Sequence, residues 1–191
     1  ERSVRLNVSV SITYPDGTPL TSGSVTLELI KEQTRKGPFN LNKTSLGEWS
    51  LSWKIPVMWE TGVWILRITA IDAAGNSGDL SQEISIIPAR LIIQLLAPVG
   101  STFSRTEKIP VRAMVKYPSK DVLTSENVSL EKGAFVVAKL VHDGVEQAFV
   151  KLNFSAEVWL GNISAPRNAT VGRNLLNVTV KDTYGNYGSY T

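Results

Sequence analysis

The only histidine, His142, is the first candidate for catalysis, because imidazole is the commonest general base near neutral pH. It stands before Asp143-Gly144 between two apolar runs, a pattern typical of a β-hairpin turn, so we expect its side chain to be exposed. We expect His142→Ala to change the stability by no more than about 0.5 kcal/mol. No G-x-S-x-G, H-E-x-x-H or P-loop pattern occurs, and the absence of cysteine removes thiolate chemistry. The sequence does not predict an enzyme.

A calcium site is the second chemical possibility. Asp72, Asn76 and Asp79 could offer three oxygen ligands, whereas Ca²⁺ takes six to eight. Asp182 and Asn186 repeat the first two positions, but the third is not repeated as an acid. The same residues are typical of an Asx turn, in which the Asp side chain accepts hydrogen bonds from nearby backbone N–H groups. We favour the turn over the metal, and no other cofactor is predicted.

Tryptophan is the third possibility. Trp49 and Trp159 occupy matching places in an internal repeat, so we expect both in the core. Trp53, Trp59 and Trp64 have no such matches. If exposed in one plane, these three rings would stack on sugars. They could equally enlarge the core or contact a neighbouring module, and the sequence leaves these alternatives open.

Asparagine offers the fourth possibility, a site for covalent modification. Of eleven asparagines, seven begin an Asn-x-Ser/Thr triplet, where chance would give roughly two. Alternation along their strands predicts that Asn7 and Asn177 face away from the core. The excess favours N-glycosylation of a secreted or surface protein; the alternative is a coincidence of common surface residues. The seven candidates are Asn7, Asn42, Asn127, Asn153, Asn162, Asn168 and Asn177.

These residues must be positioned by a repeated module. The stretch LRITAIDAAGNSGDLS from Leu66 returns 110 residues later as LNVTVKDTYGNYGSY. Tyr14-Pro15 returns 103 residues later, so the second copy carries about seven extra residues, placed in SENVSLEKGA. The repeat predicts two domains, 1–88 and 89–191, joined near Pro88 by a linker short enough to restrict their angle.

The expected elements are strands. Apolar residues alternate with polar ones from Val4 to Ile12, and each copy has about seven short runs separated by turn signals. The segment AFVVAKLVHDGVEQAFVKL predicts a hairpin. The fold class is therefore all-β, with one antiparallel β-sandwich per copy. The net charge of +3 is too small to indicate nucleic-acid binding, and no apolar run is long enough for membrane insertion.

The strand ending RITAIDAAGNSG resembles the prokaryotic Ig-like and fibronectin-type-III-like modules of bacterial and archaeal surface proteins. Lys181 and Tyr184 depart from the small residues commoner there, so the second copy matches less closely. The resemblance implies two tandem Ig-like domains without an activity of their own.

We expect a structural spacer within a longer extracellular glycoprotein, such as a surface-layer, stalk or adhesin-like protein. Its partners would be neighbouring modules or a surface lattice, and N-glycans. On tandem modules that resemble prokaryotic Ig-like ones, N-glycans without cysteine imply, through that resemblance, an archaeal cell envelope. The alternative is a carbohydrate- or protein-binding accessory module of an extracellular enzyme.

Overall fold

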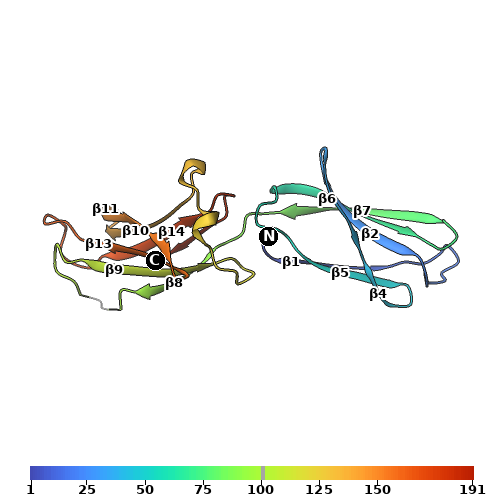
Figure 1. Ribbon diagram of the computed structural model, residues 1–191, viewed down its shortest axis with the longest axis horizontal. Helices are drawn as coiled ribbons and strands as arrows, with labels where there is room; N and C mark the ends of the chain where they lie inside the picture. Colours follow the sequence, from blue (N-terminus) through green and yellow to red (C-terminus); the bar gives the residue numbers. More distant parts are fainter. Residues whose placement is uncertain (100–101) are drawn as a thin grey trace. The chain divides into compact units, whose positions relative to one another are not determined.

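The computed structural model describes residues 1–99 and 102–191 and is built almost entirely of antiparallel strands (Figure 1). This confirms the all-β fold class expected from the period-two alternation. The chain divides into two compact units, Glu1–Ile87 and Pro88–Thr191. These are called unit 1 and unit 2, respectively.

Unit 1 is a sandwich of two sheets. One sheet has the order β1-β5-β4 and the other β3-β2-β6-β7. The strands are β1 Arg5–Ser11, β2 Ser24–Lys31, β3 Thr34–Asn40, β4 Asn42–Ser45, β5 Glu48–Lys54, β6 Gly62–Ile71 and β7 Ser77–Ile86.

Unit 2 is a sandwich of two four-stranded sheets, ordered β12-β13-β9-β8 and β11-β10-β14-β15. The extra residues of the second copy form two short 3₁₀ turns, Ser125–Asn127 and Leu130–Lys132. The strands are β8 Ile92–Ala97, β9 Ile109–Lys116, β10 Phe135–His142, β11 Val145–Lys151, β12 Asn153–Ser155, β13 Val158–Ile163, β14 Leu175–Lys181 and β15 Tyr187–Tyr190.

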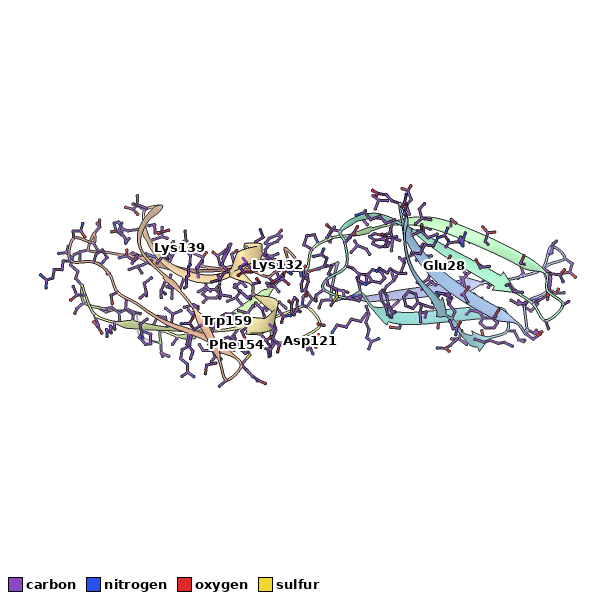
Figure 2. The ribbon with its side chains drawn as sticks, turned by 45° about the horizontal axis from the view of Figure 1, so that its top comes forward. Glu28, Asp121, Lys132, Lys139, Phe154 and Trp159 are labelled. Carbon is purple, nitrogen blue, oxygen red and sulfur yellow. The ribbon has the colours of Figure 1, made fainter. Side chains whose placement is uncertain are left out.

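The core of each unit is made by alternate residues of facing strands. In unit 1, Leu27 and Leu29 of β2 are fully buried beside Trp64 of β6. Burial of each such side chain stabilises the fold by roughly 1.5–3 kcal/mol. In unit 2, Trp159 is buried, and its Nε1 donates a hydrogen bond to the Leu123 carbonyl at 3.1 Å. Phe154 packs against the same ring at 5.2 Å between centroids (Figure 2).

The two units share their strand register. Val10 pairs with Trp49 in unit 1, and Ala113 pairs with Trp159 in unit 2. The stretch just before β1 is also repeated: Ser3 N–H donates to Ile55 O and Thr106 N–H donates to Ala165 O, both at 2.8 Å. Ser3 and Thr106 both have positive φ, at 68° and 65°. These stretches of unit 1 therefore have counterparts in unit 2.

The hairpins expected from the sequence are confirmed. β6 pairs with β7 and β14 with β15, each across an Asp-x-x-Gly-Asn turn. β10 and β11 form the hairpin whose turn contains Asp143-Gly144. The repeated Asp-x-x-Gly-Asn motif therefore forms the turn between the last two strands of each sandwich.

Candidate functional site

The turn of unit 1 after β6 is organised by the Asp72 carboxylate. Its Oδ1 accepts from the backbone N–H of Ala74 and Asn76, at 2.9 and 2.8 Å. Its Oδ2 accepts from Asn76 Nδ2 at 2.8 Å and from the Tyr14 hydroxyl at 2.9 Å. We call Tyr14, Asp72 and Asn76 the corner of unit 1, because it ties the β6–β7 turn to the residues after β1.

These bonds determine the electrostatics of the corner. The hydrogen bond from Asn76, followed by those from Tyr14 and the backbone, lowers the pKa of Asp72. The bond to Asp72 raises the pKa of Tyr14. Both carboxylate oxygens of Asp72 are thus already used by protein donors. Asp79 lies on β7 opposite Thr69, outside the turn. The geometry favours the Asx turn over the calcium site considered for Asp72, Asn76 and Asp79.

Unit 2 repeats the corner with Tyr117, Asp182 and Asn186. The Tyr117 hydroxyl donates to Asp182 Oδ2 at 2.8 Å, and Asn186 Nδ2 donates to the same oxygen at 2.7 Å. All three side chains are buried here. Asn186 makes a bond that is not seen at Asn76 among the described residues: its Oδ1 accepts from the Ala89 N–H at 2.7 Å. Burial, together with the bond to Asp182, raises the pKa of Tyr117.

A groove of about 740 Å³ lies beside the corner of unit 1. It runs between β1 and β7, and its walls include Val10, Ile12, Tyr14 and Leu80. Tyr14 is 37% exposed and Leu80 56% exposed, so much of this wall faces solvent. The groove is the site that the sequence did not predict.

Trp53, Trp59 and Trp64 of unit 1 form one continuous cluster of rings, tilted at one contact and stacked at the other. Trp53 lies 4.7 Å from Trp59, and Trp59 lies 5.4 Å from Trp64, between ring centroids. Phe39 contacts the other side of Trp53 at 4.8 Å, and Lys36 lies over Trp59. Trp64 is only 1% exposed, so the structure places it in the core instead of at the surface. Rings packed on one another favour an enlarged core over the coplanar sugar platform.

Five of the glycosylation candidates are exposed. Asn7 and Asn42 lie on β1 and β4 of unit 1, with Asn7 Oδ1 accepting from Ser52 Oγ at 2.7 Å. Asn153 and Asn162 lie on β12 and β13, and Asn168 lies in the loop after β13. Each could accept a glycan without uncovering the core.

The other two candidates are half-buried. Asn127 Oδ1 accepts from the Thr124 N–H and hydroxyl, at 3.2 and 3.0 Å, within a 3₁₀ turn. Asn177 pairs with Lys139 across β14 and β10. It lies out of phase with the buried Val178, as expected from alternation. Its Oδ1 is nevertheless covered and has no hydrogen-bond partner among the described residues, so Asn177 is much less accessible than the alternation suggested.

The structure corrects the expectation of an exposed His142. Its side chain is 17% exposed, because the loop before β14 folds against it. His142 Nδ1 lies 2.9 Å from the Arg173 carbonyl oxygen, and Nε2 lies 3.5 Å from Asp143. The contact with Arg173 fastens the loop before β14 to the end of β10.

In residues 1–99 and 102–191, no three side chains of His, Asp or Glu gather as a metal site would require. No helix among these residues is both long and apolar enough to span a bilayer.

Comparison with solved structures gives distant neighbours. The tetra-tandem repeat from the extending region of a large adhesion protein has a TM-score of 0.36 at 12% identity, covering 99% of this chain and 44% of that one. A 1.5-MDa bacterial ice-binding adhesin has a TM-score of 0.31 at 14% identity, covering 98% and 55%. A Salmonella alpha-2-macroglobulin mutant has a TM-score of 0.29 at 15% identity, covering 95% and 12%.

The chain thus spans about half the length, or less, of the structures it resembles. No protein-family model and no curated protein match the sequence. The fold described above is established by the strand pairings of the chain itself.

The groove had one signal in the sequence. At the offset of 103 that relates Tyr14 to Tyr117, the positions equivalent to the apolar run of β8 lie before Glu1. The alternation within β1 gave no hint of this difference, because both copies carry equally apolar strands at this place.

Proposed function

We propose that this chain is a load-bearing spacer segment of a larger secreted or cell-surface protein, built from tandem Ig-like modules. The observation that carries the proposal is the pairing of residues 89–91 with β15. Leu91 N–H donates to Tyr187 O at 2.7 Å, and Tyr187 N–H donates to Ala89 O at 3.2 Å. The bridge between Arg90 and Tyr187 is parallel.

Parallel pairing has a mechanical consequence. A pull applied before Ala89 and after β15 drives the two segments past each other lengthwise. Their hydrogen bonds, including the one from Ala89 N–H to Asn186 Oδ1, then share the load instead of opening one at a time. Forced unfolding is governed by the rate of crossing the unfolding barrier, and this arrangement raises that barrier.

The connection between the units supports the same role. Ile86 is buried in unit 1 and Ala89 is buried in unit 2, with two residues between them. Three residue steps extend to about 10 Å at most. Tension therefore passes from one core to the next with little slack.

The surface chemistry is part of this proposal. Exposed sequons on β1, β4, β12 and β13 would carry glycans on the faces of both sandwiches. Such sugars shield strands that otherwise risk pairing with other chains. Together with the absence of cysteine, they support a prokaryotic, and within that an archaeal, envelope protein of the surface-layer, stalk or adhesin type.

Single-molecule force spectroscopy of the chain between two handles tests the proposal. We expect two unfolding events that release about 300 and 360 Å of chain, less the folded lengths, for 87 and 104 residues. Asn186→Ala should lower the unfolding force of unit 2. Asn76→Ala is the matched control and should affect unit 1 less. Asn186 accepts a bond from Ala89 in the segment that leads into β8, whereas no described residue makes the equivalent bond to Asn76. Extension without resolved unfolding events would contradict a load-bearing role.

A further inference from the structure

We propose that the groove of unit 1 is the seat of one more β-strand, supplied by the segment of the same polypeptide directly before Glu1. The strand would pair with β1 and lie against the start of β7. The groove between these strands has a volume of about 740 Å³ and partly apolar walls. The argument rests on the equivalent place in unit 2, where such a strand is present.

In unit 2, β8 fills this place. It pairs antiparallel with β9, the counterpart of β1, as Figure 1 shows. The segment leading into β8 pairs with β15, the counterpart of β7. Along this segment and β8 the inward side chains alternate, and Ala89, Leu91 and Ala97 are all at least 90% buried. In unit 1, β1 pairs with β5, and no strand among residues 1–99 or 102–191 pairs with its other edge.

The same positions are covered in unit 2 and open in unit 1. Tyr117 is 3% exposed, whereas Tyr14 is 37% exposed. Val115 is fully buried, whereas its counterpart Ile12 is only half-buried. Asn186 is fully buried, whereas Asn76 is exposed. Unit 1 therefore carries a lining suited to a strand without the strand.

Two residues of unit 1, Gly78 and Asn76, have features that suit a strand at this place. Gly188 has no room for a Cβ, because Leu91 O and Cβ would lie against it. Its counterpart Gly78 has open space around it and no positive φ that would require glycine. Asn186 Oδ1 accepts from Ala89 N–H, whereas no described residue donates to Asn76 Oδ1. A small residue and a free acceptor are what an incoming backbone needs.

The repeat also indicates the source of the strand. Thr106 and Ser3 are counterparts, with the same positive φ and the same backbone bond to the partner strand. Eight residues, 98–105, separate Ala97 from Thr106. Glu1 and Arg2 take the places of the last two, which leaves six. The strand should therefore end about six residues before Glu1, and a segment of the same chain reaches the groove without a long loop.

The test adds the strand back. The ten residues Pro88–Ala97, PARLIIQLLA, are fused through a six-residue Gly/Ser linker to Glu1 of the whole chain. Hydrogen exchange should show new protection at Ser9–Thr13 and Ser77–Leu80, and the melting temperature of unit 1 should rise by about 5 °C. A fusion with the residues copied from Leu91 and Ile93 changed to Asp is the matched control and should show neither effect.

Gly78→Val separates seating in the groove from unspecific sticking. It should abolish the new protection in the fused chain and leave the unfused chain unchanged, because only an inserted strand would meet the new side chain. An unchanged exchange pattern in the fused chain would overturn the proposal. Protection that appears only in a dimer, seen by light scattering, would also overturn it, because the strand would then come from a second molecule.

Discussion

The Tyr117 hydroxyl donates a 2.8 Å hydrogen bond to Asp182, and both side chains are buried in unit 2. Unit 1 has the same pair, Tyr14 and Asp72 at 2.9 Å, in a partly solvated corner. Water competes for the exposed pair and not for the buried one. The chain therefore contains a natural comparison of one interaction in two environments.

The first prediction concerns this comparison. Tyr117→Phe should lower the free energy of unfolding of unit 2 by about 1–3 kcal/mol, because it leaves a buried carboxylate with one donor fewer. Tyr14→Phe should cause a smaller loss in unit 1, since water can replace the hydroxyl. Urea titration followed by hydrogen exchange would resolve the two units. Equal losses would contradict the difference in burial.

The second prediction concerns alkaline pH. Burial and the bond to Asp182 raise the pKa of Tyr117 in the folded state, so the unfolded chain loses that proton first. The contribution to stability is complete below the ordinary tyrosine pKa of about 10 and declines as the pH rises from there toward the folded-state pKa. Thermal unfolding from pH 8 to pH 11 should show a decline in unit 2 that is weaker in Tyr117→Phe. A decline of the same slope in both proteins would assign the effect to other groups.

The third prediction concerns Trp159. Trp159→Ala should lower the stability of unit 2 by roughly 3–5 kcal/mol, because it removes a buried ring and the bond to Leu123 O. Trp159→Phe keeps part of the ring and should cost less. A loss below about 1 kcal/mol for the alanine variant in denaturant titration would contradict the core placement.

The fourth prediction concerns glycans. Asn42, Asn153, Asn162 and Asn168, which are exposed, should be occupied in protein from its native source, as should Asn7. Asn127 should be occupied least, because its amide oxygen holds the 3₁₀ turn, and Asn177 should also be low, because its side chain is covered. Glycopeptide mass spectrometry measures each site. Bare asparagines throughout would remove the glycoprotein part of the proposed function.

The fifth prediction concerns His142. His142→Ala should lower stability by about 0.5–1.5 kcal/mol, because it releases the loop held at Arg173 O. Asp143→Asn, at a side chain 91% exposed and at a positive φ that Asn also tolerates, is the control and should stay within about 0.5 kcal/mol. If His142→Ala left the free energy of unfolding unchanged, His142 would instead be a freely solvated turn residue, as the sequence predicted.

Local patterns in the sequence predicted the strands well. The Asp-x-x-Gly-Asn motifs marked both closing hairpins, because the turn is made by residues that are neighbours in sequence. The matched Trp49 and Trp159 were correctly expected in the core, at 6% and 4% exposed. The alternation of apolar and polar residues also correctly predicted that Asn7 on β1 faces away from the core.

Burial that depends on distant segments was not predictable in this way. Trp64 is buried by strands far away in sequence, and His142 is covered by a loop some thirty residues further along the chain. The groove of unit 1 lies at the place that β8 occupies in unit 2, and no strand among the described residues lies there. The alternation of apolar residues and the turn motifs predict single strands and the turns that join them. The exposure of a side chain depends on which distant segments pack against its strand.

The two-residue connection between Ile86 and Ala89 has a consequence for turnover of the protein in its surroundings. A protease must draw several extended residues into its cleft, and exposed flexible connections are its usual points of attack. Here the cores on either side leave only Ile87 and Pro88 between buried residues. We therefore expect digestion at this junction to require part of a unit to unfold first, so the short connection would also protect the chain from being cut in two.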